Sequence, residues 1–372
     1  MKMLGLISFL SGLLQGLTLG QTDTRAVELL QEYIQIKTVT NSNLTDAVEF
    51  WKSLAAAENI PINVYEFTKG YPVVVMKWAG TNSSVDSIML NSHMDVVPAS
   101  MSDGWTYEPF SGHIDDNGDI YGRGVQDMKS VSIQYFEALR RLKASKKKLL
   151  RDVYMTLMPD EELGAENGMI PFLKSKEFAA MNVGVELDEG SPFPTPVIAI
   201  FYQDKVVWRK KLLNNVINII YVCVCFCNVI QCNKLINLEL PSIHSQLHEW
   251  IAEAGSNITL TYISKNQQSP ATYTNLTNPY WAAITKAAIS AGIILLPTLP
   301  PGSTDARHVR NAGYPAFGFS PMPNTELLLH AVNERLNVKT FTKGIKIYEK
   351  FIQYLANIPA AVTADDPKNP PN

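Results

Sequence analysis

Short apolar runs that alternate with helical stretches constrain the fold of this chain more than any other feature. The runs predict strands at 73–78, 87–91, 152–158 and 183–187. Apolar residues spaced three and four apart predict helices at 23–37, 46–57 and 128–143. The pattern returns with a helix at 278–291, a strand at 314–319 and a last helix at 340–356. This alternation is typical of an α/β fold with a largely parallel, helix-covered sheet.

Composition limits the kinds of partner. The 372 residues suffice for two domains or one large α/β unit, and 46% of them are apolar, which is enough for a substantial core. The net charge is −3, and the basic run at 146–151 is typical of a solvated helix end. We therefore expect no nucleic-acid partner.

The first twenty residues predict a signal peptide. Lys2 precedes an apolar run over 3–19, and the small residues Thr18 and Gly20 suit cleavage near Gly20/Gln21. A core helix or an uncleaved anchor is the alternative. Four Asn-x-Ser/Thr sequons are compatible with secretion, at Asn43, Asn82, Asn257 and Asn275.

Polar residues stand at the ends of the predicted strands, where ligands gather in open α/β sheets. In LNSHMDVVP, His93 and Asp95 are two apart and point the same way in a strand, which suits a metal-binding histidine beside the carboxylate that orients it. In LMPDEELG, three consecutive acids repel one another unless a cation or proton intervenes, and Glu161 and Glu162 should project differently. A solvated acidic turn is the alternative for this motif.

Three more strand-end or boundary motifs complete the set. VELDEGS places Glu189 after another strand, and ELLLHAVNE places His330 after an apolar run. Asp127, in YGRGVQDMKS, is by itself most simply a helix N-cap, with a metal-bridging carboxylate as the alternative. Together the histidines and carboxylates predict a paired divalent-metal site, for zinc first and manganese or cobalt as alternatives. Two adjacent metals activate water and polarise a carbonyl, which indicates hydrolysis.

These motifs, in this order, resemble the type-1 aminoacylase family (N-acyl-L-amino-acid amidohydrolases) of the co-catalytic zinc exopeptidase and deacylase clan. The segments that carry the resemblance are SHMDVVP, WTYEPFSGHIDDNGDIYGRGVQDMKS, PDEELG, LDEG, STDARHVRNAGYPAFGFSP and LLLHAVNERL. The resemblance covers about 23–206 and about 245–357. It implies a zinc-exopeptidase-like catalytic domain interrupted by a smaller α/β lid that also forms a dimer interface.

The resemblance also implies a role for individual residues. The implied ligands of two zinc ions are His93, Asp127, Glu162, Glu189 and His330. Asp127 would bridge the ions, with Glu189 completing the site of His93 and Glu162 completing that of His330.

Catalytic and substrate-binding roles follow in the same way. Asp95 would hold His93, and Glu161 would be the general base that takes a proton from the bridging water. Arg307 would grip the free carboxylate of the substrate, with Thr304 and Asp305 beside it. Three further residues receive no such role, namely Arg310, which we expect to be structural, and His113 and His308.

The resemblance breaks down over 209–243. FYQDKVVW should lead into the lid, which in this family carries a Gly-His-Ala motif whose histidine stabilises the tetrahedral intermediate. RKKLLNNVINIIYVCVCFCNVIQCNKLINLELPSI follows instead, before family-like sequence resumes at HSQLHEWIAEAG. We therefore expect a truncated lid and no family homodimer. The expected division is a signal peptide at 1–20, a catalytic domain at 21–206 and 264–358, an aberrant lid remnant at 207–263 and a loose tail at 359–372.

All four cysteines lie in that aberrant segment, at Cys223, Cys225, Cys227 and Cys232. Alternation with valine places cysteines on one face of a strand, unlike the paired C-x-x-C of zinc sites. A membrane span is disfavoured because 216–230 is shorter than about twenty residues and contains asparagine. A disulfide knot remains open, although the rest of the chain supplies no partner cysteine. Since alternating G and T encodes alternating Val and Cys, our preferred interpretation is a translated intron or a mis-joined gene model.

The functional expectation is a secreted, zinc-dependent aminoacylase that acts on small N-acyl-L-amino acids. Losing one oxyanion donor with the lid costs about 10²–10³ in rate, so we expect poor or no activity from this chain. The alternatives are a metallo-dipeptidase or carboxypeptidase of the same clan, or a catalytically dead scaffold that holds metal. If the N-terminal segment is not used as a signal, the resemblance suggests the cytoplasm.

Overall fold

The protein is seen in a computed structural model that describes residues 20–214, 220–226, 249, 258–265 and 268–360. Several predictions concern residues outside these ranges: the signal peptide, most of the aberrant segment including Cys227 and Cys232, the sequon at Asn257 and nearly all of the tail. None of the described helices is long and apolar enough to cross a membrane.

An eight-stranded sheet forms the centre of the molecule, in the order β1-β2-β5-β3-β6-β12-β7-β11. Its strands are β1 (Ile62–Thr68), β2 (Tyr71–Trp78), β3 (Ser87–His93), β5 (Val153–Met158), β6 (Val183–Asp188), β7 (Ile198–Phe201), β11 (Leu295–Thr298) and β12 (Ala316–Phe319). The central strands β5, β3, β6 and β12 are parallel, whereas β1, β2 and β7 pair antiparallel with their neighbours toward the centre. The predicted α/β class and strand positions are confirmed, with antiparallel pairings toward both edges as the added detail.

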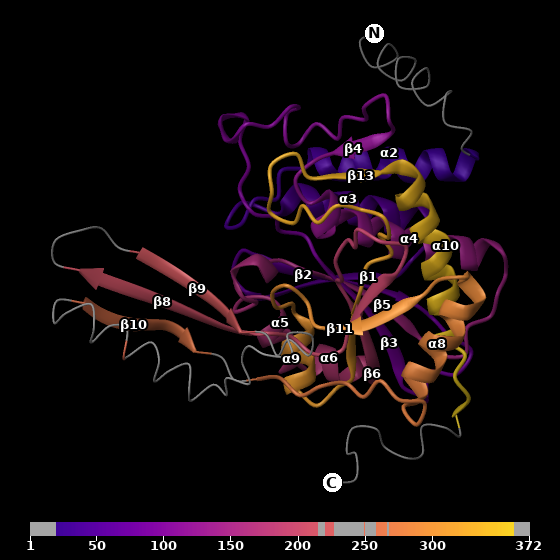
Figure 1. Ribbon diagram of the computed structural model, residues 1–372. Coiled ribbons are helices and arrows are strands. Elements are labelled where there is room, and N and C mark those ends of the chain that lie inside the picture. Colours follow the sequence, from indigo (N-terminus) through magenta and orange to yellow (C-terminus); the bar gives the residue numbers. More distant parts are fainter. Residues whose placement is uncertain (1–19, 215–219, 227–248, 250–257, 266–267, 361–372) are drawn as a thin grey trace.

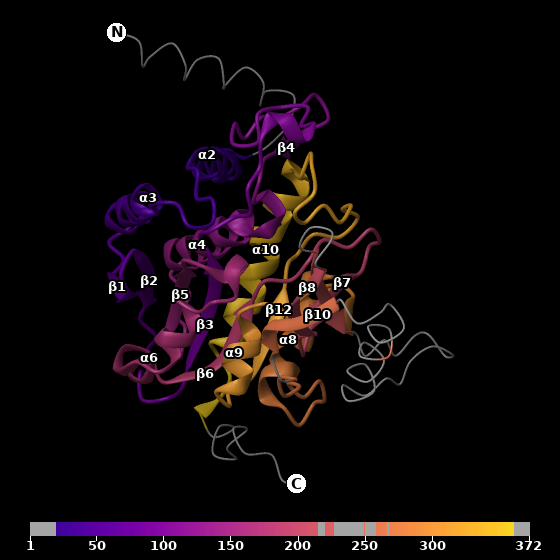
Figure 2. The same ribbon diagram turned by 90° about the vertical axis from the view of Figure 1, so that its left-hand side faces the viewer.

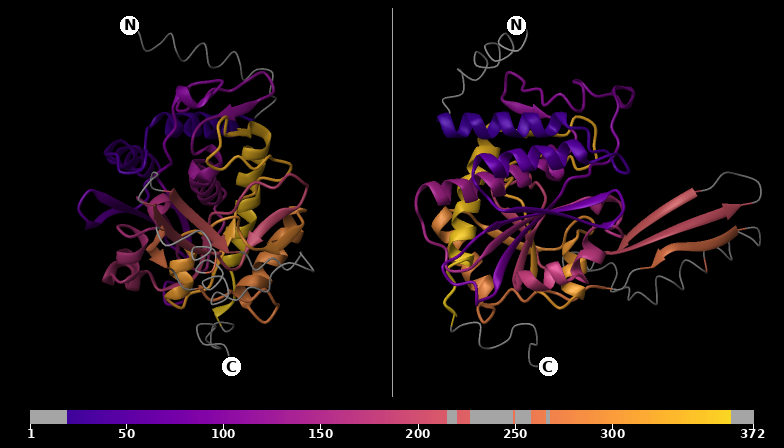
Figure 3. Two further views of the ribbon diagram at one scale, coloured as in Figure 1. Left: turned by 60° about the vertical axis from the view of Figure 1, so that its left-hand side comes forward. Right: turned by 180° about the vertical axis from the view of Figure 1, so that it is seen from behind.

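Helices cover both faces of this sheet. One face carries α2 (Gln21–Gln35), α3 (Thr45–Ala57), α4 (Ser130–Ala144), α8 (Pro279–Ala291) and α10 (Val338–Leu355). The other carries α5 (Met169–Leu173), α6 (Lys176–Met181) and α9 (Ala306–Asn311). Figure 2 shows α10, in yellow, beside α4, and in the right-hand view of Figure 3 the indigo helices α2 and α3 stack above the sheet.

The strand sequences explain why both faces are covered. Val74 and Met76 of β2 pack into the core under α2, α3 and α4, while Val73 and Val75 pack into the core under α5 and α6. Because side chains alternate across a strand, an uninterrupted apolar run has to be buried on both sides. Burial of such side chains contributes about 1.5–3 kcal/mol each.

A separate three-stranded antiparallel sheet projects from the body of the molecule (Figure 1). It consists of β8 (Val206–Asn214), β9 (Ile220–Phe226) and β10 (Ile258–Lys265), in the order β10-β8-β9. Cys223 and Cys225 occupy alternate positions of β9, paired with Arg209 and Val207 of β8. The strand predicted for the Val–Cys repeat is therefore present.

Candidate metal centre

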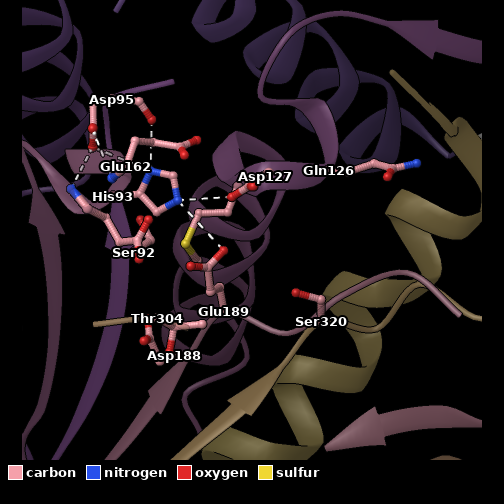
Figure 4. A network of polar contacts seen from close by, with 12 residues as sticks. Ser92, His93, Asp95, Gln126, Asp127, Glu162, Asp188, Glu189, Thr304 and Ser320 are labelled. Atoms are coloured by element: carbon pink, nitrogen blue, oxygen red, sulfur yellow. Dashed lines mark hydrogen bonds and ion pairs between the residues drawn. The ribbon is translucent and has the colours of Figure 1, made fainter. Parts of the chain in front are cut away.

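The carboxyl ends of β3, β5 and β6 meet at one edge of the sheet and carry most of the candidate site. His93 is the last residue of β3, and Glu189 directly follows β6. Glu161 and Glu162 begin the short 3₁₀ turn η4 (Glu161–Leu163), which follows β5. Asp127 comes from the turn η3 (Val125–Lys129) that leads into α4. Figure 4 shows His93 facing Asp127 and Glu189 across this edge.

The Asp127 carboxylate lies between the two histidines. Its Oδ1 is 3.1 Å from Nε2 of His93, and its Oδ2 is 3.1 Å from Nε2 of His330. Glu189 Oε2 lies 3.7 Å from the His93 nitrogen, and Glu162 Oε2 lies 2.9 Å from the His330 nitrogen. The structure thus brings all five predicted ligands together in two half-sites that share Asp127.

The simpler interpretation of Asp127, a helix N-cap, is wrong. Helix α4 begins at Ser130, and its N-cap residue Lys129 makes no side-chain cap. Gly124 opens the turn that carries Asp127, with φ 85°. A Cβ there would lie 2.6 Å from Val96 Cγ1, so the turn requires glycine both for its conformation and for its close packing.

His93 is oriented by a backbone carbonyl. Its Nδ1 lies 2.8 Å from the carbonyl oxygen of Asp95, and since a carbonyl only accepts, Nδ1 carries the proton and donates. Nε2, which faces Asp127 and Glu189, is then the nitrogen left to bind a cation in place of its own proton. This is the tautomer that a metal-binding histidine needs.

The Asp95 carboxylate mainly supports the acidic turn. Its nearer oxygen lies 3.6 Å from His93 Nδ1, while its two oxygens accept the backbone N–H groups of Glu161 and Glu162 at 3.1 and 3.2 Å. The Glu162 side chain is 4% exposed, so the alternative of a solvated acidic turn is wrong. Asp95 therefore connects His93 to Glu161 and Glu162, the predicted base and the predicted ligand beside it.

Electrostatics favour positive charge between these residues. Hydrogen bonds to Asp127 and Glu162 raise the pKa of His330 to about 10. Burial lowers the pKa of His93, but its contacts with neighbouring carboxylates outweigh that effect and raise it well above the usual value. Burial also raises the pKa of Glu162, which lies beside other acids. Such a cluster binds either protons or a cation.

The residues present fit a pair of divalent cations. Ligand atoms of His93, Glu161 and Glu189 lie within 4.8 Å of one another, and so do those of His93, Asp127 and Glu162. Oε1 of Glu162 is buried and has no hydrogen-bond partner among the described residues. A cation would satisfy that oxygen, and the donors are the nitrogen and oxygen atoms that zinc and manganese accept.

The two half-sites differ in exposure. The His93 side chain is 1% exposed, whereas that of His330 is 52% exposed. His330 lies in an irregular segment with φ 60°. A substrate would therefore approach from the His330 side.

The predicted substrate-binding residues have different surroundings. Arg307 is half-buried, donates from Nε to Nε2 of His308 at 2.9 Å, and lies with Nη2 3.4 Å from the Gly164 carbonyl of the acidic turn. Thr304 is buried, and its N–H and hydroxyl donate to Asp204 at 2.9 and 3.2 Å, so its polar groups serve the fold. Asp305 is 1% exposed, and both of its carboxylate oxygens lack a partner among the described residues.

Three residues received no site role in the sequence analysis, and the structure shows the surroundings of each. Arg310 forms a buried ion pair with Asp204, in agreement with its expected structural role. His113 stacks on Tyr107, with ring centroids 3.8 Å apart, away from the ligand set. His308, which matches no ligand position, contacts Arg307 directly.

Comparison with known proteins assigns a family. Residues 89–354 match the model of peptidase family M20/M25/M40. Aminoacylase-1A of Rattus norvegicus is 33% identical over 400 aligned positions, which cover 91% of this chain and 97% of that protein. Aminoacylase-1 of Sus scrofa is 34% identical over 395 positions, covering 90% and 96% respectively.

Solved structures share the fold. A dipeptidase of Saccharomyces cerevisiae superposes with a TM-score of 0.73 at 14% identity, covering 94% of this chain and 99% of that one. A dinuclear metal-binding peptidase of Bacillus subtilis superposes with a TM-score of 0.67 at 12% identity, covering 91% and 99%. At these identities the likeness concerns the fold alone.

Proposed function

The chain belongs to the M20/M25/M40 peptidase family, and on that premise we propose that it is a metal-dependent aminoacylase, hydrolysing N-acyl-L-amino acids to a carboxylate and a free L-amino acid. One observation carries the proposal: each oxygen of the Asp127 carboxylate lies 3.1 Å from Nε2 of a different histidine, His93 or His330. This arrangement occurs in a chain that is about one-third identical to aminoacylase-1 of Sus scrofa over 90% of its length. The substrate is a small molecule with an amide bond.

Two divalent cations, zinc first, would be held by the ligand set. His93 and Glu189 would hold one, His330 and Glu162 the other, and Asp127 would contact both. When bound, such a pair supplies an activated water molecule and a polarised carbonyl.

The residues of the chain would handle the proton and the substrate. Burial and the nearby carboxylates of Asp305 and Glu162 raise the pKa of Glu161 well above its usual value. Glu161 would accept a proton from the attacking water and pass it to the leaving amine as the C–N bond breaks. Arg307 donates from Nε to His308, from Nη1 to Ser303 and from Nη2 to Gly164, which leaves one N–H on each Nη for the carboxylate of the N-acyl amino acid.

We propose that activity is low because part of the lid is missing. The alignment with the rat relative spans 400 positions, more than the 372 residues of this chain, so the chain has gaps relative to it. Loss of the lid histidine expected from the family would remove one oxyanion donor, at a cost of about 10²–10³ in rate. The family homodimer, which uses the lid, would also be lost.

Secretion is a separate proposal. In each of the three described sequons, the hydroxyl two residues after the asparagine donates to the asparagine Oδ1, at 2.6 Å for Asn43 and Asn82 and at a short distance for Asn275. Asn43 and Asn275 are exposed and Asn82 is half-buried. All three lie in loops between regular elements, which suits N-glycosylation in a secretory compartment.

This proposal is tested by expressing the full chain, including residues 1–20, in eukaryotic cells. Secreted chain should lose mass on treatment with peptide N-glycosidase. Asn43→Gln should reduce that mass loss by one glycan, whereas the control Asn41→Gln, which lies outside any sequon, should not change it. Retention in the cytosol without glycan would favour the cytoplasmic alternative.

The function itself is tested by comparing an N-acetyl amino acid with a dipeptide as substrates of the zinc-loaded chain. Preferential hydrolysis of the N-acetyl amino acid supports the aminoacylase. Preference for the dipeptide would support the dipeptidase alternative. Bound zinc without chelator-sensitive hydrolysis of either would support a metal-holding scaffold.

A further inference from the structure

A buried ion pair lies directly behind the candidate metal centre. Glu334 is 0% exposed and Arg123 is 4% exposed, and Nη1 of Arg123 donates to Oε2 of Glu334 at 2.7 Å. Glu334 is four residues beyond His330, and Arg123 is four residues before Asp127. The pair therefore joins the two segments that supply the shared ligand and the open-side ligand.

Glu334 holds the backbone of the Asp127 turn. Its Oε1 accepts the N–H of Gln126 at 2.7 Å and that of Asp127 at 3.3 Å, and its Oε2 accepts the N–H of Gly124 at 3.1 Å. With Arg123, four donors converge on one carboxylate. No neutral side chain of the same size accepts four hydrogen bonds in this way.

Arg123 holds the other segment. Its Nη2 donates to the backbone carbonyl of His330 at 3.2 Å, and its Nη1 also reaches the carbonyl of Ala331 at 3.3 Å. The guanidinium lies 5.2 Å from the ring centre of Trp105, which fixes its plane. The guanidinium makes these bonds from two separate nitrogens, whereas a lysine offers all its donors from one nitrogen and cannot reach the same set of acceptors.

We propose that Glu334 and Arg123 are positioning residues that set the separation of Asp127 from His330 and thereby the affinity of the metal position formed by His330, Glu162 and Asp127. The proposal rests on the metal-dependent function proposed above. It predicts an unequal effect on the two ions, because His93 is oriented independently by the carbonyl of Asp95. The half-site of His93 also keeps Glu189 when Glu334 or Arg123 is replaced.

The test is zinc titration of metal-stripped full-length protein against a chromophoric chelator. The unsubstituted chain should bind two ions. Glu334→Gln puts an amide N–H₂ opposite the existing N–H donors. It should weaken the affinity for the ion at His330 by about 10–100-fold, which is the usual effect of losing a residue that supports a ligand. The affinity for the ion at His93 should stay unchanged. Arg123→Lys keeps the charge and should weaken the same ion.

Glu137→Gln is the matched control. Glu137 is also a fully buried glutamate paired with an arginine, at 2.7 Å from Arg140, but it lies on α4 and its ion pairs are with Arg140 and Arg141 of the same helix rather than with a ligand segment. It should leave both affinities unchanged even if it lowers the melting temperature. If the weaker zinc binding came only from a general loss of stability, Glu334→Gln and Glu137→Gln would lower the zinc affinity alike.

Double variants identify the affected ion. Adding His330→Ala to Glu334→Gln should cost little more than His330→Ala alone, whereas adding His93→Ala should remove the tight ion and leave only the weakened one. Two equally tight ions in Glu334→Gln and Arg123→Lys would overturn the inference. Fewer than two ions in the unsubstituted chain would overturn the proposed function instead.

Discussion

His93 donates from Nδ1 to the backbone carbonyl of Asp95 at 2.8 Å, while the nearer oxygen of the Asp95 carboxylate lies 3.6 Å away. The carboxylate is left to accept the N–H groups of Glu161 and Glu162. One residue thus performs two tasks through different atoms, and only one of these tasks depends on its side chain.

Asp95→Asn should therefore separate metal binding from turnover. The carbonyl that orients His93 remains, so the ion of that half-site should stay bound. The asparagine side chain accepts at one atom only and leaves one N–H of the acidic turn unpaired, which should lower kcat by about 10–100-fold. Metal content and kcat measured together check this, with Asp103→Asn, in an exposed turn, as control. Loss of the ion held by His93 would show instead that the carboxylate orients His93.

Glu161→Gln should remove the group that transfers the proton and leave both metal ions bound. Removal of a general base typically costs about 10²–10⁴ in rate, and glutamine keeps the volume of the side chain. We expect kcat to fall in that range, with two ions still bound by elemental analysis. An unchanged kcat would exclude Glu161 as the base.

Arg307→Lys should raise KM more than it lowers kcat. A hydrogen bond to a charged group contributes about 1.5–3 kcal/mol, so losing the planar fork should raise KM about 10–100-fold. Arg140→Lys, on a helix away from the site, should leave KM unchanged. Steady-state kinetics with an N-acetyl amino acid measure both constants, and an unchanged KM for Arg307→Lys would remove Arg307 from substrate binding.

His308 gives a prediction for stability against pH. Burial and the positive charge of Arg307 lower the pKa of His308 to about 3, whereas an unfolded histidine titrates near 6.5. Between these values the unfolded chain binds a proton that the folded chain does not, so the free energy of unfolding falls as pH falls from about 6.5 toward 3.

His308→Gln should make that decline shallower. Glutamine can still accept the Nε–H of Arg307 and does not titrate. Denaturant unfolding at a series of pH values measures the slope, with His113→Gln, an exposed histidine, as control. Equal slopes for the chain with and without His308 would contradict the assignment.

The positions of the candidate ligands could be predicted from the sequence because each follows an apolar run or a turn, while their individual roles came from the family resemblance. His93 ends β3 and Glu189 follows β6, so parallel neighbouring strands bring them together without further information. The fold class followed from the same alternation.

The supporting residues could not be predicted in this way. Glu334 accepts from backbone N–H groups, and Arg123 donates to backbone carbonyls, each more than two hundred residues away in the chain, and backbone groups leave no sequence pattern. Thr304 resembled a substrate contact, yet its polar groups bond Asp204 from a distant strand end. The antiparallel pairing of β7 with β12 depends on the path of the connecting chain rather than on either strand.

The most direct test is the initial rate of N-acetyl-L-methionine hydrolysis by the zinc-loaded full chain, before and after removal of the metal by a chelator and again after zinc is restored. The account predicts slow hydrolysis, with kcat/KM below about 10⁴ M⁻¹ s⁻¹, that disappears with the metal and returns with it. Absence of any N-acetylmethionine hydrolysis by protein that carries both ions would contradict the proposed aminoacylase activity, and hydrolysis at ordinary enzyme rates would contradict the proposed loss of the lid.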